Sequence, residues 1–94
     1  MNVRAIFSQM GMILGDIISE NETQYEIENP VLLVTQREGA ALVPFLALME
    51  EKTVYFKKSS LAFNQTFTPV IDVINNYNQM YGSGIVQVAG KIKI

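Results

Sequence analysis

The most informative hydrophobic pattern of the chain lies in residues 25–36, YEIENPVLLVTQ. Apolar and acidic side chains alternate over residues 25–28, which predicts a half-buried strand with one face in solvent. Every position of residues 31–34 is apolar, so the same strand is expected to enter an interior that is covered on both sides. Pro30 lies at the change and predicts a bulge, a bend or an edge position, because proline cannot donate to a ladder. One long strand that serves two walls is typical of small closed barrels.

Shorter alternating stretches predict further strands, which cover residues 3–7, 12–20, 53–58 and 61–67. In the last of these, the expected core-facing residues are Leu61, Phe63 and Phe67. Gly15 lies in the middle of the second strand, where a glycine indicates a bend, a bulge or a close backbone approach. The pattern up to residue 67 is therefore that of a small all-β structure.

Residues 40–49 contain good helix formers, but they also contain Pro44, which a helix interior does not tolerate. We favour an extended segment there and keep a helix as the alternative. Thr68 and Pro69 form a helix start, which predicts one C-terminal helix over residues 69–81. Its core-facing positions are Val70, Val73, Ile74, Tyr77 and Tyr81. A short strand and a tail are expected over residues 85–94.

The length of 94 residues fits a single domain, residues 1–94. Hydrophobic residues make up 49% of the chain and charged residues only 17%. Because a small domain cannot bury this much apolar surface, the composition predicts a homo-oligomer, with an unusually apolar monomer as the alternative. The N-terminus lacks the layout of a signal peptide, and the longest apolar run is about half a membrane span. We therefore expect a soluble protein that is neither secreted nor bound to a membrane.

The absence of cysteine and histidine removes much chemistry. Disulfides, thiolate zinc sites, cysteine nucleophiles and the serine triad are excluded by residue type. Glu26 and Glu28 lie two apart on a strand, about 7 Å from each other, which is a glycosidase-like separation. No other part of an active site accompanies them, so a solvated strand face is the better interpretation. The sequence predicts no enzyme and no cofactor.

Two other groups also lack the pattern that their chemistry needs. Asp16, Glu20 and Glu22 could hold a hard cation, but the spacing of a calcium loop is absent, so no metal site is predicted. The glycine-rich residues 82–84 follow the helix, whereas phosphate-binding loops precede one. A helix C-cap is the better interpretation of these glycines.

Lys57 and Lys58 are the only adjacent basic pair before the C-terminal tail, and Tyr55 and Phe56 lie directly before them. Lysine beside an aromatic ring can bind a phosphate backbone and stack a base. Lysines that keep an edge strand soluble are the more common explanation. The net charge of −2 gives no general attraction for nucleic acid.

The order of these elements resembles the Sm-like (LSm) family, whose members are strongly bent five-stranded barrels that assemble into rings. Residues 3–7, 13–17 and 25–27 are similar to its first motif, in which a strand glycine lies between apolar positions. Residues 56–61 correspond in position to its second motif, where an Arg-Gly pair and a tight turn join the last two strands. Here Lys57 and Lys58 replace the Arg-Gly pair, and the helix follows the barrel instead of preceding it.

The chain more closely resembles uncharacterised Sm-like proteins of tailed phages and marine metagenomes. The stretches that carry this resemblance are residues 28–31, 43–45 and 77–85. It implies a protein of the cytoplasm of a bacterial or infected host cell. The RNA sites of the Sm-like family use a loop Asp and Asn, and Asn21 lies in the corresponding loop.

Together these observations predict an all-β, strongly bent, five-stranded Sm-like barrel over residues 2–67 with one C-terminal helix. We expect a homo-oligomeric, non-enzymatic module for which single-stranded RNA is a candidate ligand. The candidate nucleic-acid-binding residues are Asn21, Tyr55, Lys57 and Lys58. The alternative is a phage structural or assembly protein that contacts only protein partners. No small-molecule substrate is identified.

Overall fold

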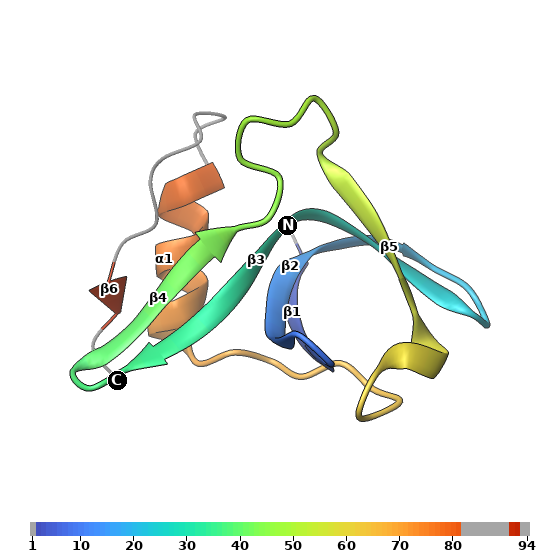
Figure 1. The fold of residues 1–94 in the computed structure, drawn as a ribbon, viewed down its shortest axis with the longest axis horizontal. Coiled ribbons are helices and arrows are strands. Elements are labelled where there is room, and N and C mark those ends of the chain that lie inside the picture. The colour runs from blue at the N-terminus through green and yellow to red at the C-terminus, as the bar shows by residue number, and fades with distance from the viewer. Residues whose placement is uncertain (1, 82–90, 93–94) are drawn as a thin grey trace.

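The computed structural model describes residues 2–81 and 91–92, which form a mostly β structure with one C-terminal helix (Figure 1). The elements are β1 (Val3–Ser8), β2 (Gly11–Glu20), β3 (Gln24–Gln36), β4 (Gly39–Pro44), β5 (Thr53–Lys57), the 3-10 turn η1 (Lys58–Ser60), α1 (Ile71–Tyr81) and β6 (Lys91–Ile92). The strands form one antiparallel sheet in the order β1-β2-β3-β4-β6, with β5 paired to β3. The predicted β-rich fold with a C-terminal helix is confirmed.

The long strand β3 changes its partner halfway along one edge. Its other edge pairs with β2. On the changing edge, residues 24–28 pair with β5 and residues 31–36 pair with β4. Between the two ladders Asn29 has a φ of 51°, and its N–H donates to the carbonyl oxygen of Lys52 at 2.7 Å. The irregularity that Pro30 predicts is confirmed, because this proline lies between the two ladders.

Gly15 in β2 allows β2 and β3 to approach each other closely. The register of the β2–β3 ladder shifts between Leu14 and Asp16. A Cβ atom on Gly15 would lie 2.1 Å from Cγ2 of Ile27 and 3.2 Å from the carbonyl oxygen of Glu28. The close approach expected from a glycine in mid-strand is confirmed, and no larger residue fits there unless the Ile27 side chain or the backbone of β3 shifts.

The buried side chains form two clusters. The first, which we call the helix core, packs the sheet against α1 and contains Val3, Ala5, Leu14, Val31, Ala40, Leu42, Val73, Tyr77 and Met80. The second, which we call the β5 core, contains Ile6, Ile13, Tyr25 and Ile27, with Phe45, Phe56 and Leu61 among the half-buried residues against it. Neighbouring residues of β1 and β2 point to different clusters, because side chains alternate along a strand.

Tyr77 fastens α1 to the sheet. Its hydroxyl donates to the carbonyl oxygens of Glu28 at 3.0 Å and of Asn29 at 2.9 Å, beside the break in β3. Burial raises the pKa of this phenol well above its ordinary value, because the anion would lose water. The one proton of this hydroxyl is thus shared between two carbonyl groups at the position where β3 changes its partner from β5 to β4.

The helix begins at Ile71, two residues later than predicted. The carbonyl oxygen of Val70 accepts hydrogen bonds from the N–H groups of Val73 at 3.0 Å and Ile74 at 3.1 Å, so Val70 is the N-cap. The prediction that Val70 faces the core is wrong, since 67% of this residue is exposed. A cap residue lies outside the helical rotation that defines the apolar stripe.

Residues 61–67 are not the regular strand that alternation predicts. They make one isolated bridge to β1, between Phe67 and Ala5. The prediction that Phe63 faces the core is also wrong, because 54% of it is exposed and its ring packs edge-on against Phe7 and Phe67. The physical reason is that η1 turns the chain, and Arg4 then holds this segment through the hydroxyl groups of Thr66 and Thr68.

Residues 40–49 divide into a strand and a loop. Residues 40–44 belong to β4, so the extended interpretation is confirmed for them, whereas the chain turns after Pro44. Val34 is exposed, so the second half of β3 is not covered on both faces as predicted. A tail is the sequence-based expectation for residues 91 and 92, but they form the short strand β6, which pairs with Ala40 and Ala41 of β4. The strand predicted at residues 85–88 lies outside the described residues.

Candidate functional site

The candidate nucleic-acid residues come together at the end of the β2–β3 hairpin. Asn21 lies in the turn between β2 and β3, and the N–H of Lys58 donates to the carbonyl oxygen of Thr23 in that turn at 2.8 Å. Tyr55 and Lys57 lie on β5, two residues apart, and pair with Glu26 and Gln24 of β3. All four therefore occupy the region where β5 runs into η1.

Asn21 has a structural task in the turn. Its Oδ1 atom accepts hydrogen bonds from the N–H groups of Thr23 at 2.8 Å and Gln24 at 3.0 Å, and from the Thr23 hydroxyl at 3.1 Å. This Asx turn replaces backbone hydrogen bonds that a tight connection leaves open. The acceptor of the Asn21 side chain is therefore already used within the protein.

The charge of Lys58 is balanced by its neighbours. Its Nζ atom lies 2.6 Å from Oε2 of Glu20 and 4.8 Å from the centre of the Tyr25 ring. Its side chain is also mostly buried, whereas the Glu20 carboxylate remains about half exposed. Lys58 thus closes the end of the hairpin through an ion pair and a cation–π contact. It is a poor candidate for a free phosphate ligand.

Tyr55 presents an exposed ring whose hydroxyl is bound. The hydroxyl donates to Oε2 of Glu26 at 3.1 Å, and Oε1 of the same carboxylate accepts from the Ser19 hydroxyl at 2.8 Å. The hydrogen bond to Glu26 and the negative charge of that carboxylate raise the pKa of the Tyr55 phenol above its ordinary value. Lys57, on the same face of β5, is exposed and has no ionic partner among the described residues.

The electrostatic balance of this polar face is negative. Glu20, Glu22 and Glu26 lie on the same hairpin as the turn, opposite only two lysines. A surface that binds a phosphate backbone normally has an excess of cations. The fold therefore brings the predicted residues together, whereas the negative charge of this face does not favour binding of RNA.

The acidic residues considered for catalysis or metal binding are spread out. Glu26 is bound by Tyr55 and Ser19, and Oδ1 of Asp16 accepts from the N–H of Asn2 at 2.7 Å. Among residues 2–81 and 91–92, no three Asp or Glu side chains come close enough together to hold a metal ion.

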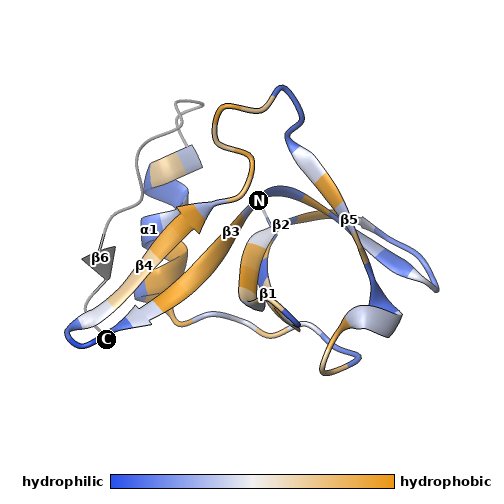
Figure 2. Ribbon diagram, in the orientation of Figure 1, coloured by the Kyte–Doolittle hydropathy of each residue, from blue (hydrophilic) through white to orange (hydrophobic). Residues whose placement is uncertain are grey.

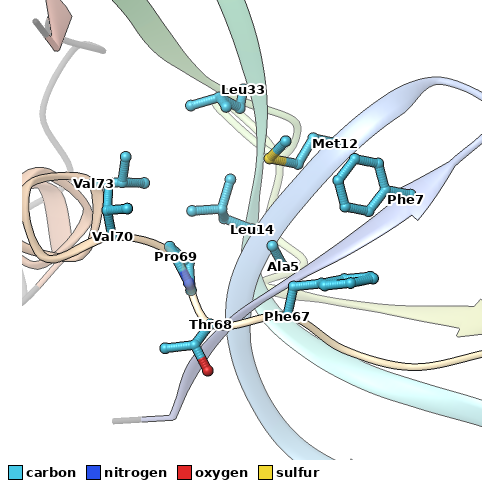
Figure 3. Close-up of a pocket in the computed structure, with 10 residues that line it drawn as sticks. All are labelled: Ala5, Phe7, Met12, Leu14, Leu33, Phe67, Thr68, Pro69, Val70 and Val73. Carbon is cyan, nitrogen blue, oxygen red and sulfur yellow. The ribbon is translucent and has the colours of Figure 1, made fainter. Parts of the chain in front are cut away.

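A second candidate site, which sequence patterns did not identify, is an open apolar pocket between α1 and the sheet (Figure 3). It has a volume of about 260 Å³. We call it the apolar pocket; its lining residues are Ala5, Phe7, Met12, Leu14, Leu33, Phe67, Thr68, Pro69, Val70 and Val73. In the described part of the chain, the Thr68 hydroxyl is the one polar side-chain group that lines the pocket, and Arg4 donates to that oxygen. Its chemistry is therefore that of a binding surface for apolar groups.

The rim of the apolar pocket carries further exposed hydrophobic groups. Val70 and Ile71 at the start of α1 are about two-thirds exposed, and Met10 lies in the turn between β1 and β2, the strands that supply Phe7 and Met12. The high apolar content of the sequence indicates a surplus of this kind but cannot locate it. The position of this surplus depends on how the segment before α1 crosses β1. Residues 61–69 show no hydrophobic period that predicts this crossing.

No model of a known protein family matches this chain, and no curated protein matches it either. No helix in the part of the chain that the structure describes is long and apolar enough to cross a membrane.

Proposed function

We propose that this protein is a non-enzymatic, Sm-like interaction module that associates with copies of itself through the apolar pocket. The observation that carries the proposal is a pocket of about 260 Å³ whose floor is apolar and whose rim includes exposed Val70. An exposed apolar concavity next to further exposed hydrophobic side chains is typical of an interaction site. A protein partner would bury the apolar surface of this pocket, and such binding requires no catalytic group.

A small barrel is supported by hydrogen bonds that run around the molecule. Ladders connect β1 to β2, β2 to β3 and β3 to β5. The chain then returns to β1, where Ala5 and Phe67 exchange two hydrogen bonds of 2.8 Å and the N–H of Ala62 donates to the carbonyl oxygen of Phe7 at 2.8 Å. This circuit is the pattern expected of a closed sheet. The turn η1 also lies where the Sm-like resemblance places the tight turn between the last two strands.

Strand edges give independent support for self-association. Within the described residues, β5 pairs only with β3, and residues 42–44 of β4 pair only with β3 as well. An edge of this kind offers free N–H and C=O groups to a strand of another molecule. Two such edges on one chain are compatible with repeated contacts between copies.

The absence of catalytic activity is proposed from the lining of the apolar pocket. Among the described residues that line it, Thr68 supplies the one polar side chain, which is already bound to Arg4, and none is Asp or Glu. General acid–base chemistry requires a titratable group within reach of a bound molecule. The pocket therefore fits recognition better than reaction.

Sedimentation velocity over a concentration series tests the proposal. We expect oligomers at tens of micromolar protein, and we expect Leu33→Gln to shift them toward monomers because it places an amide in the pocket wall. Ile18→Gln, at an exposed position of β2 outside the pocket, is the matched control and should leave the distribution unchanged. A monomer at every concentration would remove the proposal.

Binding of single-stranded RNA is a second candidate, favoured by Lys57, which is exposed and has no ionic partner among the described residues, on the same strand as the exposed ring of Tyr55. Filter binding of short RNA over a salt series tests it. Retention that falls with salt and is lost in Lys57→Glu would support it, because phosphate contacts produce that salt dependence. Arg37→Glu, in the exposed turn between β3 and β4, is the control. No retention at low salt would exclude this candidate.

A further inference from the structure

The loop after β4 carries apolar side chains into solvent. Leu48 is fully exposed and Met49 is about half exposed, at the tip of a turn closed by a hydrogen bond from the N–H of Met49 to the carbonyl oxygen of Leu46 at 3.0 Å. We call residues 45–49 the apolar loop; it is the hydrophobic segment that leaves β4 at the top of Figure 2. Isolated exposed leucines are ordinary, but a leucine at the tip of an anchored turn is a protruding apolar group.

The backbone of the apolar loop holds Leu48 in a costly conformation. Its φ of 70° lies in the left-handed region, which glycine and asparagine adopt much more readily than leucine. The base of the loop is fixed, because the N–H of Phe45 donates to the carbonyl oxygen of Pro30 at 3.1 Å and its ring packs near Phe56. Leu48 contributes nothing to either core, so the fold itself does not explain why this leucine is there.

The apolar loop and the apolar pocket lie at different ends of the molecule. In Figure 1 the loop between β4 and β5 is at the top, whereas the first turn of α1, which supplies Val73 to the pocket and follows directly on Val70, is at the bottom. The loop therefore cannot fill the pocket of its own chain. The pocket is large enough for the tip of a loop, since a cavity of about 150 Å³ already holds a benzene molecule.

Charges beside the two features are complementary. Glu50 and Glu51 follow the tip of the loop directly and are exposed. Beside the pocket, the guanidinium group of Arg4 binds the side chains of Thr66 and Thr68, and among the described residues it has no carboxylate partner. A loop that enters the pocket brings acidic groups toward an unneutralised cation, which favours a defined orientation.

We propose that Leu48 and Met49 of one copy insert into the apolar pocket of a second copy, with Glu50 and Glu51 directed toward Arg4 of that copy. This inference rests on the proposed self-association and specifies the contact. The two surfaces differ, so the contact is heterologous, and each pair of copies keeps one free loop and one free pocket. Association then continues until a ring closes or a chain forms.

Two substitutions break the contact from opposite sides without damaging the fold. Leu48→Asn removes the apolar tip and suits the left-handed backbone, so the monomer should be at least as stable as the natural protein. Val70→Asp places a carboxylate at the pocket rim, and aspartate is a favoured N-cap residue at this position of α1. Thermal unfolding of each variant checks that it is folded.

Sedimentation velocity of the two variants, separately and mixed, tests the proposal. Each variant alone should associate at least tenfold more weakly than the natural protein, so it should be monomeric at concentrations where the natural protein forms oligomers. An equimolar mixture should form dimers and nothing larger, because the loop of Val70→Asp can enter the pocket of Leu48→Asn while the remaining loop and pocket are both disabled. Ile18→Asn, at an exposed site in neither feature, should associate like the natural protein.

The outcomes separate this inference from the proposed function. If the natural protein is monomeric at every concentration, both the proposed self-association and the loop insertion are overturned. If it associates and Leu48→Asn associates equally well, the inference is overturned while self-association stands. A mixture that stays monomeric also overturns it, because a heterologous contact must be restored by complementary variants. Glu50→Gln combined with Glu51→Gln should weaken association a few-fold and reduce its salt dependence.

Discussion

The two halves of β3 end in surfaces of opposite character. In its first half, the wet face carries Glu26, which binds Tyr55 and Ser19, and the ion pair between Lys58 and Glu20 closes the hairpin nearby. In its second half, Leu33 lies in the wall of an open apolar pocket, where the partner is α1. The polar groups at one end find partners within the chain, whereas the apolar groups at the other end do not.

This difference follows from what covers each half. The β5 core is closed by a strand, which pairs residue by residue along β3. The helix core is closed by an eleven-residue helix whose N-cap, Val70, remains largely exposed at the pocket. A helix contacts a sheet along a stripe, so the part of the sheet beyond its first turn remains exposed. The apolar pocket lies at that position.

The largest effect is expected where the two cores meet. Gly15→Ala would place a Cβ atom 2.1 Å from Cγ2 of Ile27, so the buried Ile27 side chain or the backbone of β3 must move. We expect a loss of about 3 kcal/mol in the free energy of unfolding, because overpacking a closed core is poorly accommodated. Chemical denaturation measures this loss.

A double-mutant cycle identifies the cause. Ile27→Ala removes Cγ2, so the combined variant Gly15→Ala with Ile27→Ala should be clearly more stable than the sum of the two single losses predicts. Strictly additive losses would show that Gly15 acts through backbone conformation and not through contact with Ile27.

A smaller loss of stability is expected from a substitution in α1 that leaves the contact between β2 and β3 unchanged. Tyr77→Phe leaves the carbonyl oxygens of Glu28 and Asn29 without their donor, which should cost about 1 to 3 kcal/mol. The apolar pocket should widen as α1 loosens, so binding of a hydrophobic dye should rise. Tyr55→Phe is the control, since its hydroxyl bond is exposed; an equal loss in both variants would contradict the difference between the halves.

The same tyrosine sets a dependence on alkaline pH. The buried phenol of Tyr77 has a raised pKa, whereas in the unfolded chain it ionises near pH 10. The Tyr77 phenol therefore makes its full contribution to the free energy of unfolding below about pH 10. This contribution decreases at higher pH, because the unfolded state releases the proton first. Denaturation midpoints should fall above about pH 10, less steeply in Tyr77→Phe. Identical pH profiles would contradict this assignment.

The smallest effect is expected on the polar face of the first half. Glu26→Gln should lower the pKa of the Tyr55 phenol toward its ordinary value, because it removes the carboxylate that opposes ionisation, with little change in stability. Phenolate absorbance, compared with and without Tyr55→Phe, reports this pKa. Glu22→Gln, in the exposed turn, should leave it unchanged; a pKa unmoved by Glu26→Gln would contradict the assigned hydrogen bond.

The parts of the fold that could be predicted from sequence are those with a local cause. Alternation located β1, β2, β5 and the first half of β3, Gly15 and Pro30 marked the irregular positions, and Thr68 with Pro69 predicted the start of the helix to within two residues. The bridging segment 61–67 was mistaken for a strand, because alternation there reflects contacts with Phe7 and Arg4 and not a continuous ladder. The gathering of Asn21 and Lys58 was partly foreseeable, since both lie in turns at the ends of paired strands.

By itself the sequence determined most of the strands and the C-terminal helix, the chemistry excluded by the lack of cysteine and histidine, and a surplus of apolar residues. Tertiary structure alone decided where that surplus lies. Side chains far apart in the chain, such as Met12, Leu33 and Val70, line one pocket because α1 covers only part of the sheet. It likewise decided that Lys58 meets Glu20 and that Leu48 points into solvent. Periodicity records which face of an element is apolar, but not which faces are left uncovered.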